Sequence, residues 1–120
     1  MPGHAYITNA DPNLLKGIAI HVAGGMGFGV QDAAPWSVKV TQSSRAASLF
    51  LGAFVCYCDF NVNVVSSPDG TQHLVLERNN PWWTGWIGMN RVKNRARELA
   101  DAYGNELIRQ GVQILQRNDF

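Results

Sequence analysis

Only two of the 120 residues are cysteines, Cys56 and Cys58. Two positions apart on a strand, their side chains point the same way, and a disulfide between them would strain the backbone. A thiolate metal site needs further ligands, but the sequence has no third cysteine, and its three histidines do not lie at ligand spacing. We therefore expect neither a disulfide nor a bound metal, and we expect a reducing, cytoplasmic compartment.

Long apolar runs are also missing. The longest extends from Ala46 to Cys58 and is interrupted by Ser48 and Gly52, so it falls short of the about 20 residues that a membrane span needs. The start of the chain has neither the basic nor the apolar region of a secretory signal. Charge is scarce too: 16% of the residues are charged and the net charge is +1, which favours neither nucleic acid nor a membrane as a partner.

What the sequence does have is a hydrophobic content of 46%, which suits one folded domain over residues 1–120. Alternating apolar residues predict strands at His4–Thr8, Leu14–Ala23 and Trp36–Thr41, and a longer one from Phe54. The glycine-rich segment 24–29 lacks the spacing of a dinucleotide-binding loop and is interpreted as a connection between strands. The segment Thr41–Ala53 fits either a short helix or the beginning of the long strand.

The best turn signal is the sequence Ser-Pro-Asp-Gly at residues 67–70. Proline at the second position and glycine at the fourth suit a type I turn followed by a bulge. This turn predicts a hairpin in which Thr71–Arg78 returns along the preceding strand. Val64 then lies opposite Leu74 and Val62 opposite Leu76, so the apolar faces of the two strands coincide.

The last third of the chain predicts one long amphipathic helix from Asn90 to Gln116, with Asn90 as its N-cap. Alternatively, the helix ends near Gly111 and Val112–Leu115 forms a short strand. The resulting fold class is α+β: a single antiparallel sheet of four or five strands with a long C-terminal helix packed on one face.

Three tryptophans, Trp82, Trp83 and Trp86, lie within five residues just before the predicted helix. Indole rings bring large apolar area, so they are suited to capping the core of the sheet and helix. They are equally suited to a subunit interface or to the wall of an apolar ligand pocket. We include all three among the candidate ligand-binding residues.

The segment from Arg78 to Arg97 holds five basic residues and no acidic one. Four of them fall in the first two turns of the predicted helix, the positive end of its dipole, where cations are unfavourable. An anion held near Arg91 and Arg95 would offset this conflict. Alternatively, the side chains extend along the rim of the sheet with their charged ends in water.

Acid–base chemistry has one candidate pair, His73 and Glu77 on the same predicted strand face, but no nucleophile is paired with a base. The second sheet face also carries apolar residues such as Val65 and Val75, which favours self-association. We therefore expect a non-enzymatic, homo-oligomeric binding domain without a cofactor. Its predicted ligand site, for an apolar or anionic molecule, consists of Trp82, Trp83, Trp86, Arg91 and Arg95. The alternatives are a small enzyme or phosphate- or carboxylate-binding protein, and a single-stranded nucleic-acid-binding protein.

Overall fold

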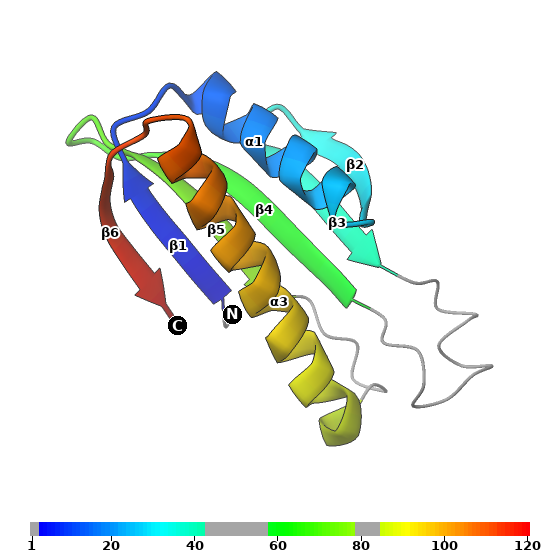
Figure 1. Ribbon diagram of the computed structural model, residues 1–120. Coiled ribbons are helices and arrows are strands. Elements are labelled where there is room, and N and C mark those ends of the chain that lie inside the picture. The colour runs from blue at the N-terminus through cyan, green and yellow to red at the C-terminus, as the bar shows by residue number, and fades with distance from the viewer. Residues whose placement is uncertain (1–2, 43–57, 79–84) are drawn as a thin grey trace.

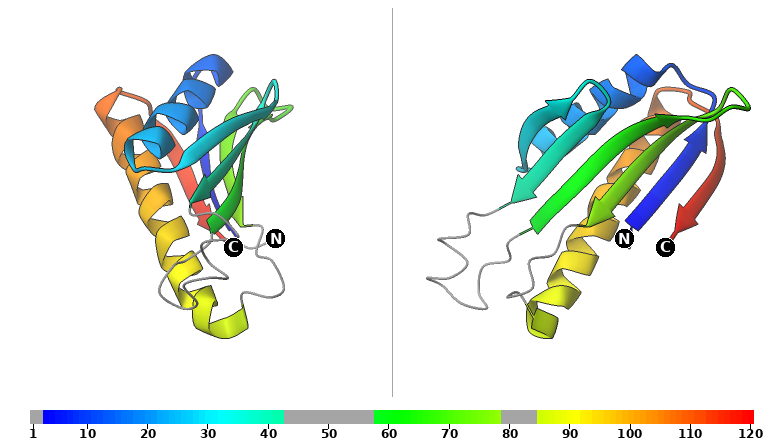
Figure 2. Two further views of the ribbon diagram at one scale, coloured as in Figure 1. Left: turned by 90° about the vertical axis from the view of Figure 1, so that its right-hand side faces the viewer. Right: turned by 180° about the vertical axis from the view of Figure 1, so that it is seen from behind.

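The computed structural model describes residues 3–42, 58–78 and 85–120. Its elements are β1 (Gly3–Thr8), α1 (Pro12–Gly25), β2 (Gly29–Ala34), β3 (Ser37–Gln42), β4 (Cys58–Ser66), β5 (Gln72–Arg78), α3 (Gly85–Arg109) and β6 (Ile114–Asp119). The strands form one antiparallel sheet in the order β2-β3-β4-β5-β1-β6. Both α1 and α3 pack against the same face of this sheet (Figures 1 and 2). The predicted α+β class is therefore confirmed, but the sheet has six strands rather than four or five, and a second helix covers it.

The segment Leu14–Ala23, predicted as a strand, belongs to helix α1, so that prediction was wrong. The Asp11 carboxylate accepts a hydrogen bond from the backbone N–H of Asn13 at 2.7 Å and caps the helix, and Pro12 occupies its first turn. The buried residues follow helical spacing: Leu15, Ile18, Ala19 and Ala23. The apolar residues that alternate along this segment also fit a helical stripe, and the capping sequence decides between the two.

Strand β2 was not predicted from the sequence, which indicated a connection between two strands at residues 24–29. In the structure this segment ends α1, turns at Gly27 with φ of 89°, and enters β2 at Gly29. Most of β2 is exposed at the edge of the sheet. Its sequence therefore has little of the apolar alternation by which strands are recognised.

The hairpin between β4 and β5 is confirmed with its predicted register. Val64 lies opposite Leu74 and Val62 opposite Leu76, and all four side chains are buried under the helices. Gly70 takes the positive φ that the turn requires, 88°. Turn chemistry and strand pattern specify the same register, so this region depends little on distant residues.

Helix α3 begins at Gly85 and ends at Arg109, so the predicted limits Asn90 and Gln116 were both wrong. The alternative end near Gly111 is confirmed: this glycine has φ of 76°, and β6 follows at Ile114. The early start places Arg91 six residues inside the helix. Because the dipole effect fades within the first turn, the basic residues do not oppose it as strongly as the sequence suggested.

The core lies between the sheet and the two helices. Tyr103, Phe60, Leu15, Leu99 and Leu107 are among its largest side chains, each at most 1% exposed. Of the helices in the described part of the chain, neither combines the length and apolar content of a membrane span. The question of helix or strand over Thr41–Ala53 falls mostly outside the described residues.

Candidate functional site

Of the five predicted ligand-binding residues, Arg95 is the one whose side chain the structure describes. Its guanidinium pairs with Glu98 at 2.7 Å, donates to the carbonyl oxygen of Met26 at 3.0 Å, and lies 4.8 Å from the ring centre of Phe28. Arg95 therefore connects α3 to the segment that follows α1. Trp82 and Trp83 lie outside the described residues, as do the side chains of Trp86 and Arg91 in α3. A ligand-binding role for this set stays a prediction.

A pocket of about 440 Å³ lies on the other side of α3 from Arg95. Its wall residues come from the middle of α3, the start of β1 and the ends of β5 and β6. They are Gly3, His4, Arg78, Lys93, Asn94, Arg97, Asp119 and Phe120. Figures 1 and 2 show these chain segments at the same end of the sheet, next to the middle of α3.

Helical spacing determines which basic residues of α3 reach this pocket. Lys93 and Arg97 are four residues apart and lie on the same side of the helix. Arg95, two residues from each, is rotated by about 200° at 100° per residue and faces α1 instead. The run of basic residues in the sequence therefore divides into a pocket side and a packing side.

The strands supply the opposite wall through their register. His4 of β1 lies opposite Asp119 of β6, and Gly3 lies opposite Glu77 near the end of β5. A β-carbon on Gly3 would collide with the carbonyl oxygen of Leu76, so this position has no room for a side chain. The backbone of Gly3 is also tied to Phe120 by two hydrogen bonds, of 2.7 and 2.9 Å. These contacts hold the ends of β1 and β6 together at the pocket.

Arg78 is the most unusual residue of the pocket. It lies opposite Phe60 in the sheet, on the face that the helices cover, and is only 9% exposed. Within the described part of the chain, its buried Nη1 atom has no hydrogen-bond partner. A buried guanidinium nitrogen without an acceptor is costly, because the group has lost its hydration and gained nothing in return. Such a group indicates that a partner is missing from the pocket.

The other two permanent cations of the pocket are also uncompensated. Lys93 is exposed, and the Arg97 guanidinium donates to the Asn94 side-chain oxygen at 3.3 Å. Among the described residues, neither has a carboxylate within ion-pair distance. Lys93, Arg97 and Arg78 thus bring three positive charges to one pocket, and each is available to an anion.

Asp119, the one carboxylate side chain that the described part of the chain brings to the pocket wall, is already paired. It accepts hydrogen bonds from His4 Nδ1 at 2.6 Å and from Arg117 Nε at 3.1 Å. The hydrogen bond from His4 is the main reason that the pKa of Asp119 lies below its ordinary value, with Arg117 contributing further. Asp119 is therefore ionised at neutral pH, and among the described residues it pairs with Arg117 rather than with the pocket cations.

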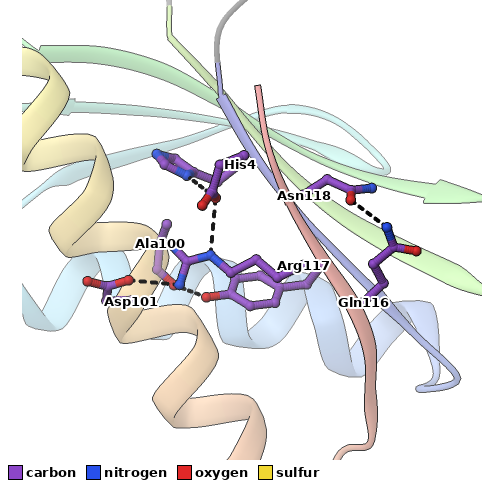
Figure 3. Close-up of polar contacts among 8 residues, drawn as sticks. His4, Ala100, Asp101, Gln116, Arg117 and Asn118 are labelled. Carbon is purple, nitrogen blue, oxygen red and sulfur yellow. Dashed lines mark hydrogen bonds and ion pairs between the residues drawn. The ribbon is translucent and has the colours of Figure 1, made fainter.

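Arg117 does not line the pocket, but it contacts residues that hold this wall in place (Figure 3). Besides Asp119, it pairs with Asp101 of α3 at 2.8 Å and lies 5.3 Å from the ring centre of Tyr6. The Tyr6 hydroxyl in turn donates to the carbonyl oxygen of Ala100 at 2.8 Å. Strand β6, helix α3 and strand β1 are linked by these contacts, so the two walls of the pocket keep a fixed separation.

His73 and Glu77, the predicted acid–base candidates, lie on the opposite face of the sheet from the pocket and from Arg95. Their neighbours Leu74 and Leu76 face the helices, and side chains alternate along a strand. The His73 Nε2 atom lies 3.1 Å from the hydroxyl of Thr71. The structure therefore does not bring this pair together with the basic residues of α3.

Some of the residues that line the pocket could be predicted from the sequence. Sequence reasoning singled out the basic run that contains Arg78, Lys93 and Arg97, but it selected Arg91 and Arg95 from that run. It missed His4 and Asp119, which lie 115 positions apart and meet only through the pairing of β1 with β6. The spacing of Lys93 and Arg97 along α3 was the one signal that could have identified the pocket side of the helix.

Comparison with other proteins gives no family for this chain, since no protein-family model and no curated protein matches it. Within the described residues, no three His, Cys, Asp or Glu side chains are grouped closely enough to hold a metal ion. A functional conclusion must therefore come from the chemistry of the pocket itself.

Proposed function

We propose that the protein is a binding protein for a small phosphate- or carboxylate-bearing molecule, which it holds in the pocket between α3 and the ends of β1, β5 and β6. The observation that carries the proposal is the buried Nη1 atom of Arg78, which lacks a partner among the described residues. A guanidinium is permanently charged, and its geometry matches the oxygens of a carboxylate or a phosphate. An anion in the pocket supplies the acceptor that Arg78 lacks.

Charge supports the same assignment. Arg78, Lys93 and Arg97 contribute three positive charges, and Asp119, the one carboxylate side chain among the described wall residues, is paired with His4 and Arg117. Charges near a protein surface interact by about 4 kcal/mol at 4 Å, several times more strongly than in bulk water. The pocket volume of about 440 Å³ also lies within the range of small-molecule sites, roughly 300–1,000 Å³.

Binding accounts for the pocket better than catalysis does. Its described wall has no serine, threonine or cysteine to act as a nucleophile. The strand face with His73 and Glu77 is separated from it by the sheet. Single-stranded nucleic acid calls for an extended basic groove with stacking rings, whereas the three cations here converge on one pocket.

The Arg78→Met variant tests this proposal by thermal unfolding with and without sodium phosphate or sodium acetate at constant ionic strength. A ligand at one hundred times its dissociation constant stabilises a protein by about 2.7 kcal/mol, so the wild type should unfold at a higher temperature with a bound anion. Arg78→Met should lose this response. Its stability without the anion should stay the same or rise, because methionine leaves no buried donor unpaired.

Two further variants keep the test decisive. Arg97→Gln removes a pocket cation at an exposed position and should weaken the response, even if Arg78→Met folds poorly. Arg109→Gln, also on α3 but outside the pocket, should respond as the wild type does. If neither anion shifts the wild-type transition, or if all variants respond equally, the proposal is wrong.

A further inference from the structure

We infer that the pocket selects a doubly charged phosphate monoester of a small molecule over singly charged anions. This inference rests on the proposed anion site and concerns which anion that site takes. Three permanent cations face the pocket: Arg78 from β5, and Lys93 and Arg97 from α3. A single negative charge leaves most of this positive charge uncompensated, whereas a phosphate monoester carries about 1.5 to 2 negative charges at neutral pH.

The pairing of Asp119 determines how much of the positive charge of the three cations is available to a ligand. If Asp119 were free, it would cancel one of the pocket cations and make a monoanion sufficient. Instead, its carboxylate accepts hydrogen bonds from His4 and from Arg117, and Arg117 is not part of the pocket wall. Arg117 shares its positive charge between Asp119 and Asp101. Within the described residues Asp119 forms no ion pair with Arg78, Lys93 or Arg97, so these three cations stay open to a ligand.

The number of donors supports a phosphate as well. Arg78 Nη1, the Lys93 ammonium and the Arg97 guanidinium come from two separate elements, β5 and α3. A phosphate monoester presents three acceptor oxygens at tetrahedral angles, one for each cation. A carboxylate has two oxygens in one plane, so its acceptor directions suit donors from two separate elements less well.

The volume of the pocket indicates that the phosphate is attached to an organic group. About 440 Å³ lies within the range of sites for whole small molecules. At β1 and the end of β6 the wall offers His4 and the half-exposed Phe120, which carry no permanent positive charge. The carboxylate of Asp119 lies on that side too and disfavours negative charge there. Charge alone therefore orients the ligand, with its phosphate toward Arg78 and α3 and its organic part toward β1 and β6.

Methyl phosphate and methyl sulfate provide the test, because both are tetrahedral methyl esters with three terminal oxygens but differ in charge at pH 7.5. We expect isothermal titration calorimetry to show methyl phosphate binding tighter on the order of tenfold or more. Lys93→Gln should reduce this preference by weakening methyl phosphate more than methyl sulfate. Arg109→Gln, outside the pocket, should retain the wild-type preference.

The outcomes separate the two proposals. If neither ester binds, the proposed anion site itself is wrong. If both bind equally well, or if Lys93→Gln leaves the preference unchanged, the anion site stands and the selectivity inferred here is overturned. A phosphoserine-containing peptide measured in parallel identifies the source of the phosphate. Tighter binding of the peptide than of glycerol phosphate would overturn the assignment to a small molecule.

Discussion

A β-carbon placed on Gly104 of α3 would lie 2.5 Å from the hydroxyl oxygen of Tyr6 in β1. The helix and the strand therefore meet at a point where only glycine leaves enough room for the tyrosine. The same hydroxyl donates a hydrogen bond to the carbonyl oxygen of Ala100, one turn earlier in α3. This contact fixes the distance between the helix and the strand beside the pocket, whose cation Arg97 lies less than one turn before Ala100.

Gly104→Ala should destabilise the protein, although alanine favours a helix interior over glycine by about 1 kcal/mol. The added methyl group has to displace the Tyr6 hydroxyl or move the helix, and overpacking of this kind costs about 1 to 3 kcal/mol. Urea unfolding measures the change. Gly17→Ala in α1, where a β-carbon meets nothing within 4 Å, is the matched control and should stabilise the protein. Equal effects at the two glycines would contradict the close contact.

Arg117→Met should loosen β6 without unfolding the rest of the chain. Arg117 is one-third exposed and pairs with Asp101 and Asp119, and ion pairs of this kind contribute about 1 kcal/mol or less each. Amide hydrogen exchange should therefore accelerate in β6, while the central strands β4 and β5 keep their protection. Arg109→Met removes the ion pair of a more exposed arginine, 69% against 32%, and should leave β6 unchanged. Uniform acceleration across the sheet would show that Arg117 stabilises the whole fold instead.

Glu106 should make stability depend on pH in the acidic range. Hydrogen bonds from Arg109 and then Gln110 lower the pKa of this carboxyl from 4.5 to about 2. Because the pKa is lower in the folded protein, the stabilisation is complete above the ordinary value and is lost as pH falls toward 2. In Glu106→Gln, unfolding free energy measured by urea titration should therefore decline less steeply between pH 5 and 2. Identical curves for variant and wild type would exclude this contribution.

Self-association, expected from the sequence, stays a prediction. The uncovered face of the sheet exposes Val65 by 47% and partly exposes Val75, but the polar residues His73 and Asn63 lie directly opposite them. Size-exclusion chromatography with light scattering should give a dimer or larger species at micromolar concentration if this face is an interface. A clean monomer would remove the case for an oligomer, and it would leave the proposed pocket unaffected because the pocket is on the other face.

The sequence was most informative where local chemistry and strand pattern agreed. The turn at residues 67–70 predicted the register of β4 with β5, with Val64 opposite Leu74 and Val62 opposite Leu76. The sequence was least informative where one pattern of apolar residues fitted both the two-residue period of a strand and the 3.6-residue period of a helix. Ile18, Ile20 and Val22 alternate like a strand, yet only the first is fully buried and Ile20 is 37% exposed, because the segment is helical. The capping pair Asp11 and Pro12 is the signal that resolves this ambiguity in favour of a helix.

The pocket depended on tertiary contacts that no local pattern contains. His4 gains its role from Asp119, and Arg78 gains its unusual position from burial beneath the helices. The basic run in α3 was visible in the sequence, but its division between two sides of the helix required the helix limits and the position of α1. Arg95 packs toward α1, and Lys93 and Arg97 face the pocket.

The most direct test of the account is an NMR titration of the ¹⁵N-labelled protein with methyl phosphate at constant ionic strength. An anion bound in the pocket should shift the backbone amides around it most strongly, above all Arg78, Lys93, Asn94 and Arg97. The NMR signals of the β2 amides, at the far edge of the sheet, should not shift. Saturable shifts confined to the pocket are the result that the account predicts. Shifts centred on another surface, or none at all, would contradict its central claim.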